Sequence, residues 1–222
     1  ESILRRDRAK LQSSRQAGPR FHQLKIDGDV EAVCAQLRTD PEVESAQPNY
    51  VYHPCRTPND PDFADQYAHQ LIQMPDAWDI STGSHDVVVA VLGTGVDVNH
   101  PDLKDNIWTN ADEIADNGID DDNNGYVDDV RGWNFEADNN LLIPEMVLYG
   151  VEGHETMVAG VIAAVGDNGE GVCGVNWQCS IMPLRVSLYI TTAEVAEALD
   201  YAADNGAHIV NMSFGADEFG TE

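Results

Sequence analysis

Basic residues are almost absent from the larger part of this chain. The 222 residues carry a net charge of −27, and this charge is unevenly placed. Residues 1–56 hold nine Lys and Arg against eight Asp and Glu, whereas residues 57–222 hold three against 31. Because nucleic-acid binding needs Lys and Arg to neutralise phosphates, this composition argues against a nucleic-acid partner. It suits bound cations or a salty environment, and the shift predicts a domain boundary near residue 56.

A long apolar run is also missing. No segment approaches the roughly 18 consecutive apolar residues of a membrane-spanning helix, so we expect no membrane span. The chain starts at Glu1 and shows no signal peptide. Both ends look cut, so we infer no location from the missing leader.

Cysteine is scarce, and its spacing excludes common cysteine-based sites. The four cysteines, Cys34, Cys55, Cys173 and Cys179, form no C-x-x-C pattern of a metal or redox site. We expect free or buried thiols. A disulfide between Cys173 and Cys179 is the alternative for a secreted protein.

The N-terminal part contains a short strand–helix–strand pattern. Residues 1–20 are polar and basic, which suggests the remnant of a helix. FHQLKID (21–27) alternates as a strand does, and Asp29 can cap a helix that continues to about Arg38. VESAQPNYVY (43–52) is predicted to be a second strand. Such a short unit is too small to be a secure independent domain.

Strands and helices alternate in the acidic part, after a proline-rich linker over residues 53–63. This alternation indicates a parallel sheet covered by helices, with its chemistry at the carboxyl ends of the strands. The first strand delivers Gly93, which has no side chain, to such an end. The predicted elements are a strand at 87–92, a buried helix at 156–165, a strand at 181–186, a helix that a capping box at Thr191 and Glu194 opens and Gly206 closes, and a strand at 208–214.

DEIADNGIDDDNNGYVDD (112–129) concentrates acidic residues around a tight turn. Asp120, Asp122 and Asn124 follow the opening of an EF-hand loop, in which alternate residues supply oxygen ligands for Ca²⁺. Arg131 stands where the bidentate Glu would be, and no helices are predicted to flank the loop. We predict a Ca²⁺ site that uses part of such a loop, and a solvated acidic turn is the alternative. The predicted ligands are Asp120, Asp122, Asn124, Tyr126 and Asp128.

Four segments resemble, in order, the motifs of the subtilisin-like serine proteases. AVLGTGVDVNHPDL (90–103) is similar to the aspartate motif, and GHETMVAG (153–160) to the histidine motif. IVNMSFG (209–215) resembles the segment that lines the substrate cleft, and AQPNYVY (46–52) the end of an inhibitory propeptide. The similarity extends over about 21–214.

The resemblance implies an α/β fold, a doubly wound parallel sheet incomplete at its C-terminus, preceded by a partial α+β ferredoxin-like propeptide. Residues 1–56 would be a propeptide remnant and linker, and residues 57–222 the N-terminal part of the peptidase domain. It implies a polypeptide substrate or peptide ligand, the chain's own propeptide segment in the cleft, a monomer, and a secreted or extracellular location. Because an inactive chain cannot cut itself, we expect residues 1–56 to stay attached.

The resemblance also implies roles for single residues. His154 stands at the position of the catalytic base, but Gly93 stands where the family has its triad aspartate. Glu155 and Met157 replace a glycine and a second histidine, and no Gly-Thr-Ser nucleophile segment occurs in the chain. Acyl transfer needs a nucleophile, a base and a group that orients the base, so we predict that this chain is catalytically incompetent. The residues expected to line the cleft are Ser213, Phe214 and Gly215.

A second Ca²⁺ site is implied by the resemblance alone. In the family, a loop after the histidine helix closes around Ca²⁺ through backbone carbonyls and an Asn side chain. The aspartate of His-Pro-Asp-Leu joins that site, as does an N-terminal aspartate in some members. Position by position, the implied ligands are Asp60, Asp102, Gly166, Asn168, Glu170 and Val172.

Two functions remain open at this point. The first is the proform of a subtilisin-like serine endopeptidase, inactive in this chain. The alternative is a calcium-binding pseudoprotease that acts by binding peptides or proteins, and the departures at Gly93, Glu155 and Met157 favour a real loss of catalysis. A dedicated Ca²⁺-binding module would explain residues 112–129 but not the histidine motif.

Overall fold

The structure, a computed structural model, divides into two compact units. The units are Glu1–Pro54 and Cys55–Glu222, and the structure describes residues 11–17, 21–50, 56–143 and 153–215.

No helix in the described part of the chain is long and apolar enough to cross a membrane.

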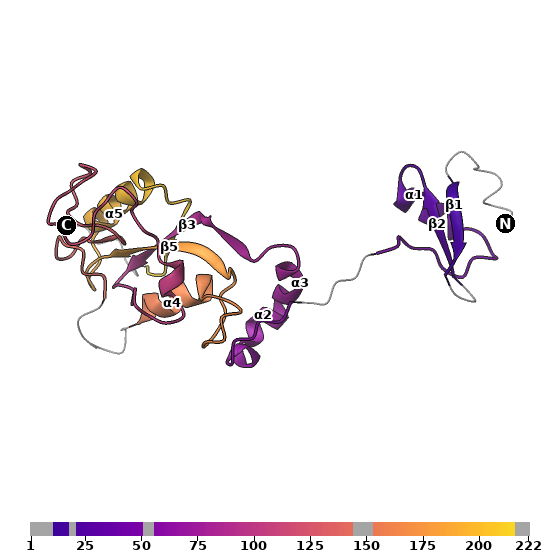
Figure 1. The fold of residues 1–222 in the computed structure, drawn as a ribbon, viewed down its shortest axis with the longest axis horizontal. Helices are drawn as coiled ribbons and strands as arrows, with labels where there is room; N and C mark the ends of the chain where they lie inside the picture. Colours follow the sequence, from indigo (N-terminus) through magenta and orange to yellow (C-terminus); the bar gives the residue numbers. More distant parts are fainter. Residues whose placement is uncertain (1–10, 18–20, 51–55, 144–152, 216–222) are drawn as a thin grey trace. The chain divides into compact units, whose positions relative to one another are not determined.

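The first unit is a β-hairpin followed by one helix (Figure 1). β1 (Leu11–Gln16) pairs antiparallel with β2 (His22–Ile26). α1 (Val30–Leu37) begins at Asp29, whose side chain accepts a hydrogen bond from the amide of Ala32 at 3.2 Å. The predicted strand and the predicted helix with its aspartate cap are therefore confirmed.

Two predictions for this unit are wrong. Residues 11–16 form a strand and no helix, because pairing with β2 satisfies their backbone groups in a segment whose serines disfavour a helix interior. Residues 43–50 form no strand, and the end of the segment predicted to do so lies outside the described residues. Pro48 cannot donate a backbone hydrogen bond, and no described strand of this unit lies beside the segment. A ferredoxin-like propeptide stays a prediction.

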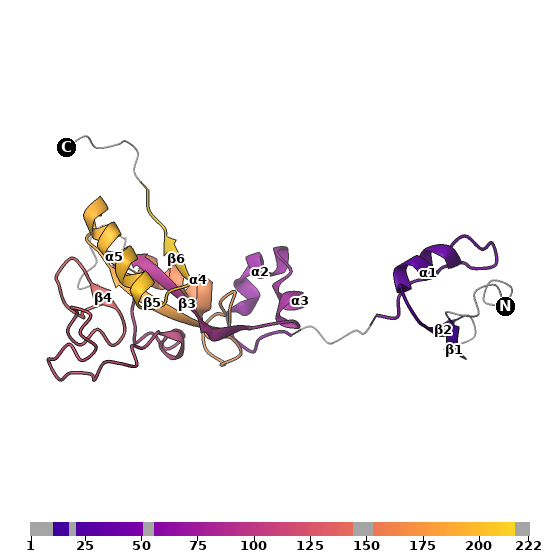
Figure 2. The same cartoon turned by 90° about the horizontal axis from the view of Figure 1, so that it is seen from above.

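The second unit is built on a parallel sheet with the strand order β4-β5-β3-β6 among its described residues (Figure 2). β3 pairs on one edge with β5 and on the other with β6, so it is the central strand. The register places Gly93 opposite Arg185 and Leu92 opposite Met212, so three strands end at the same edge of the sheet. The strands are β3 (Gly83–Gly93), β4 (Trp133–Asn134), β5 (Gln178–Arg185) and β6 (Ile209–Met212).

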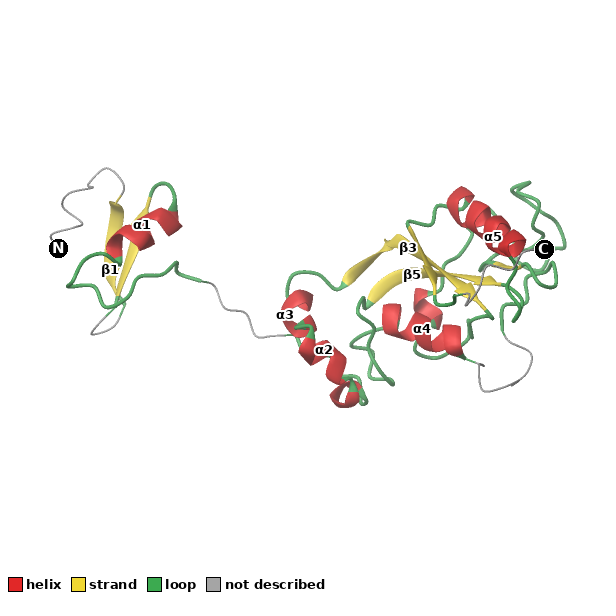
Figure 3. Ribbon diagram, turned by 180° about the vertical axis from the view of Figure 1, so that it is seen from behind, coloured by secondary structure: helices red, strands yellow, loops and turns green. Residues whose placement is uncertain are grey.

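Helices cover both faces of this sheet (Figures 1 and 3). α4 (His154–Ala163) packs against the face that Val89 and Val91 supply, through Ala159 and Ala163 among others. α5 (Thr192–Asp204) packs against the opposite face, where Ala90 and Leu92 contact a cluster that includes Ala198, Tyr201 and Ala202. Alternate residues of one buried strand thus supply two cores. The predicted α/β fold with a helix-covered parallel sheet is confirmed.

A third core cluster of this unit is mainly aromatic. Phe63, Trp78 and Trp177 pack there with Cys173. The remaining described elements of the unit are α2 (Tyr67–Leu71), α3 (Met74–Trp78) and the 3-10 turns Phe63–Asp65 and Lys104–Asn106.

The described cysteines are buried free thiols, as expected. Cys173 and Cys179 lie in different core clusters and form no disulfide, so that alternative is wrong. Burial, reinforced by the charge of Asp60, raises the pKa of the Cys173 thiol to about 12. Cys34 is also buried and free, and Cys55 lies outside the described residues.

α5 begins with the predicted capping box. The Thr191 hydroxyl accepts a hydrogen bond from the amide of Glu194 at 3.2 Å, and the Glu194 carboxylate accepts one from the amide of Thr191 at 2.8 Å. Ser187 donates to the same carboxylate at 3.1 Å. Desolvation acts to raise the pKa of Glu194, but the hydrogen bonds from Thr191 and Ser187 outweigh it and lower the pKa.

We predict that Glu194→Gln lowers the free energy of unfolding by about 1 kcal/mol at pH 7. The pKa of Glu194 is lower in the folded chain than in the unfolded one. Its contribution is therefore present above the ordinary glutamate pKa and is lost as the pH falls through the folded value. Urea unfolding of both proteins between pH 7 and pH 4 measures the difference, with the exposed Glu197→Gln as control. A difference that stays constant with pH would contradict the assignment.

Candidate active site and candidate metal loop

The first turn of α4 lies against the carboxyl end of β3, where Gly93 ends the strand. α4 begins at His154, and Gly153 before it is left-handed with a φ of 74°, which glycine adopts without strain. The amide of Asp97, in the loop after β3, donates to the hydroxyl of Thr156 at 2.9 Å. His154 is half-buried at this junction. The fold thus brings the predicted base and the predicted gap in the triad to one place.

Glu155 fills the space that Gly93 leaves. Its side chain is buried, with 5% of the residue exposed. A Cβ atom built on Gly93 would lie 2.1 Å from Oε1 of Glu155 and 2.4 Å from its carboxyl carbon. Oε2 of Glu155 accepts a hydrogen bond from the hydroxyl of Thr94 at 2.6 Å. The sequence showed that Gly93 and Glu155 both depart from the family pattern, but not that the two positions touch.

The predicted cleft-lining residues follow β6 at the same edge of the sheet. Ser213, Phe214 and Gly215 are exposed, and the side-chain amide of Asn211 donates to the Ser213 hydroxyl at 2.9 Å. Because β6 lies beside β3 in parallel, these residues and Gly93 share one edge. Their role in a cleft stays a prediction.

The acidic loop brings three carboxylates together. One oxygen each of Glu113, Asp120 and Asp122 lies within 4.8 Å of the others. Glu113 is 8% exposed, and its Oε1 accepts hydrogen bonds from the amides of Asp121 and Asp122 at 2.7 and 3.2 Å. Its Oε2 is buried and has no hydrogen-bond partner. A buried carboxylate oxygen without a donor is costly, so this group of residues fits a divalent cation.

Sequence reasoning missed Glu113 as a ligand. It lies inside the acidic segment, but seven residues before the EF-hand pattern that the prediction followed. The alternating Asp and Asn residues from Asp120 onward did not indicate that Glu113 folds back onto the loop. Only the bonds from two amides of the loop to its carboxylate reveal its place.

Two further predicted ligands lie in the same turn. The amide of Asn124 donates to Oδ1 of Asp120 and to Oδ1 of Asp122, at 3.0 Å each. The amide of Tyr126 donates to Oδ1 of Asn124 at 2.8 Å. Gly125, with a φ of 100°, permits the turn between them. The side-chain oxygens of these residues therefore accept hydrogen bonds from the backbone of the turn, and their role as Ca²⁺ ligands stays a prediction.

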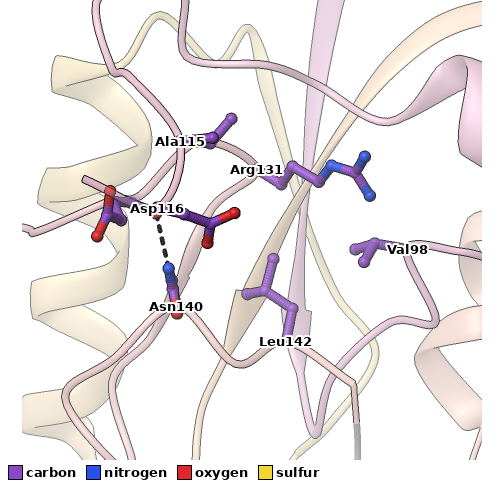
Figure 4. A pocket seen from close by; sticks show the side chains of 8 residues that line it. Val98, Ala115, Asp116, Arg131, Asn140 and Leu142 are labelled. Carbon is purple, nitrogen blue, oxygen red and sulfur yellow. Dashed lines mark hydrogen bonds between the residues drawn. The ribbon is translucent and has the colours of Figure 1, made fainter. Parts of the chain in front are cut away.

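Asp128, the last predicted ligand of this loop, has its carboxylate on other partners. It accepts hydrogen bonds from the amides of Asn117 at 3.0 Å and Gly118 at 2.9 Å. Its backbone carbonyl accepts one from the side-chain amide of Asn140 at 3.0 Å (Figure 4). Among the described residues, Asp128 borders a cavity of about 270 Å³ that holds no other predicted site residue. The cavity is lined by Val98, Ala115, Asp116, Asp128, Val130, Arg131, Asn140 and Leu142.

The neighbouring Asp129 fastens the loop to α5. Its carboxylate is fully buried and accepts hydrogen bonds from the side-chain amides of Asn110 and Asn124, both at 3.1 Å. The hydroxyl of Tyr201 donates to it at 2.5 Å. Burial, together with this bond to Asp129, raises the pKa of Tyr201, so the hydroxyl keeps its proton and remains a donor.

The second predicted calcium site also converges. Asp60 is buried and accepts hydrogen bonds from the amides of Asp167 at 2.8 Å and Asn168 at 3.2 Å. Asp102 is buried and accepts one from the side-chain amide of Asn168 and one from the amide of Val172, both at 2.9 Å. Each carboxylate keeps lone pairs that a cation could use. The other implied ligands, Gly166 and Glu170, lie in the same loop.

Comparisons with known proteins agree with this geometry. The Subtilase family matches residues 84–221. The chain is 33% identical to the thermophilic serine proteinase of Bacillus sp. strain AK1 over 202 residues, which are 89% of this chain and 43% of that protein. It is 37% identical to thermitase of Thermoactinomyces vulgaris over 163 residues, 72% of this chain and 48% of that protein. A solved protease structure from Pseudoalteromonas arctica PAMC 21717 matches with a TM-score of 0.51 and 36% identity, over 72% of this chain and 51% of that one.

The chain spans less than half the length of these two sequence relatives. The family match covers nearly all of β3, all of α4 and the residues after β6 that are predicted to line a cleft, and the parallel sheet with helices on both faces agrees with it. The chain therefore belongs to the subtilase family.

Proposed function

We propose that this chain supplies the base-bearing part of a serine endopeptidase, with His154 as the general base. The observation that carries the proposal is the contact between the first turn of α4 and the end of β3 at Gly93. In acyl transfer the base takes the proton of the nucleophile and returns it to the leaving amine. The exposed residues after β6 would hold an extended peptide beside that base.

The 222-residue chain by itself is proposed to be inactive, and a protein completed with a nucleophile segment should be less active than the relatives because Gly93 cannot orient an imidazole. In subtilisin, loss of the triad aspartate lowers turnover by roughly 10⁴-fold, and loss of the base or nucleophile by roughly 10⁶-fold. The alternative, a calcium-binding pseudoprotease, is favoured by the same strand end without a side chain. It would bind peptides without cutting them.

The test joins the 222-residue chain to a Gly-Thr-Ser segment from a subtilase relative. We expect slow labelling by a serine-reactive fluorophosphonate and slow hydrolysis of a peptide substrate. His154→Ala should remove both, because it deletes the imidazole proposed as the base. Met157→Ala, an exposed position on the same helix, is the control.

The outcomes separate the two functions. If the joined protein folds, binds a peptide and labels no faster than its His154→Ala variant, the peptidase proposal fails and the pseudoprotease stands. Circular dichroism and peptide binding by fluorescence anisotropy establish which case applies.

We also propose that the acidic loop binds Ca²⁺. Glu113, Asp120 and Asp122 would supply carboxylate oxygens, with Asn124 and the backbone of Tyr126 as further ligands. The unpartnered Oε2 of Glu113 supports the proposal. A bound ion would offset the repulsion of three close carboxylates and hold the loop in place. The second site would use Asp60, Asp102, Gly166, Asn168, Glu170 and Val172.

We predict that Ca²⁺ raises the unfolding temperature of the chain. A ligand at about 100 times its Kd stabilises by about 2.7 kcal/mol. Asp120→Asn combined with Asp122→Asn should remove one site in isothermal titration and much of the thermal shift, while the second site remains. The control is Asp138→Asn, the same charge change at an exposed residue whose φ of 51° suits Asn. Equal effects of the control and the double variant would refute binding at this loop.

Location and processing remain part of the proposal. A polypeptide substrate is supported by the family alone. An extracellular site of action and a monomeric state are part of the same proposal. Residues 1–56 would act as a propeptide remnant and linker that stays attached unless another protease removes it.

A further inference from the structure

We propose that Gly93 and Glu155 form a coupled exchange, in which α4 supplies the carboxylate that the strand end lacks. Glu155 is then the positioning residue for His154. The inference rests on the proposed role of His154 as the base. The carboxylate of the site would then have moved from the end of β3 to α4 and would not have been lost.

The Glu155 side chain occupies the space that a side chain at position 93 would need. A Cβ on Gly93 would lie 2.1 Å from Oε1 of Glu155, 2.4 Å from its carboxyl carbon and 2.5 Å from its Cγ. In an aspartate, the carboxyl carbon lies about 1.5 Å from Cβ. An aspartate at position 93 would therefore place its carboxyl group in the volume that Glu155 already fills. The Glu155 side chain fits because position 93 is glycine, and a side chain at 93 fits only if Glu155 is gone or turned away.

The hydrogen bonds of Glu155 also leave room for a second donor. Glu155 is 5% exposed, and the hydroxyl of Thr94 is its donor among the described contacts, at Oε2. No described contact occupies Oε1, so this oxygen can accept a further hydrogen bond. Two basic side chains of this unit have other partners: Arg131 donates to Asn99, and Arg185 pairs with Glu136.

His154 is the donor that the position offers. It is half-buried and adjoins Glu155 in the first turn of α4, at the end of β3. The described structure shows no hydrogen bond between the two side chains. Catalytic hydrogen bonds are often formed or shortened only when substrate binds. The other carboxylate in the adjoining loop, Asp97, accepts a hydrogen bond from the amide of Asn99 at 3.0 Å.

A double-mutant cycle tests the coupling in the 222-residue chain. Gly93→Asp alone should lower the unfolding temperature strongly, because two carboxylates would compete for one volume. Glu155→Gly alone should lower it as well, since it leaves the Thr94 hydroxyl without its acceptor. Gly93→Asp with Glu155→Gly should recover most of both losses. Gly160→Ala, where an added Cβ meets no atom within 4 Å, is the matched control.

Additive losses in the double variant would overturn the exchange. If Gly93→Asp fails to fold, Gly93→Ala replaces it, since a lone Cβ already meets Glu155 at 2.1 Å. A Gly93→Ala variant as stable as the parent chain would overturn the proposal equally.

The positioning role needs a readout that packing does not move. Nitrogen-15 NMR of the His154 ring at alkaline pH reports which ring nitrogen carries the proton. We expect the Nδ1–H form in the parent chain, a mixture in Glu155→Gly, and the Nδ1–H form again in the double variant. An unchanged tautomer in Glu155→Gly would show that Glu155 does not act on His154.

Activity in the joined protein separates this inference from the proposed function. Glu155→Gln should lower kcat by at least about 10²-fold with little change in KM, because the orienting carboxylate acts in the transition state. If His154→Ala abolishes hydrolysis but Glu155→Gln leaves kcat intact, the base is confirmed and the positioning role is refuted. If His154→Ala has no effect, the proposed function fails instead.

Discussion

β3 is the constraint on which the second unit depends. It is paired on both edges and covered on both faces, so its alternate residues are committed to two separate cores. No polar side chain can be placed along its buried half without the cost of an unpaired polar group. Chemistry is therefore possible only where the strand ends, and there the fold brings the start of α4 and the residues after β6. The pairing and burial of β3 therefore determine where the site can lie.

Those elements whose signals are local could be predicted from the sequence. The apolar run at 87–92 lies within β3, and the Thr191 and Glu194 pair opens α5 as predicted. The first residues of β3 are polar or exposed and pair with β5 across the sheet, so no local pattern marks them. The prediction for residues 11–16 was wrong for the same reason, because their strand conformation depends on pairing with β2.

The candidate site could be predicted in its positions but not in its contacts. The sequence located the predicted gap at Gly93 and the predicted base at His154, since both lie in motifs that occur in the family's order. It could not place Glu155 at the strand end, because that placement depends on packing between distant segments. It also could not bring Glu113 to the amides of Asp121 and Asp122, because the EF-hand pattern begins after Glu113. The carboxylate of Asp128 accepts hydrogen bonds from the amides of Asn117 and Gly118, which the local pattern did not indicate.

The buried carboxylate at the strand end decides how the loss of the aspartate is understood. A site that had only decayed could fill the space beside Gly93 with a small apolar side chain at little cost. The structure instead buries Glu155 there, with a hydroxyl donor and a second oxygen facing the empty position of a side chain. Burial of a charge is stabilising only when donors meet it, and His154 is the donor at hand. The buried charge of Glu155 is thus better explained by a hydrogen-bond partner than by packing. An aspartate restored at position 93 alone would occupy the volume of the Glu155 carboxylate.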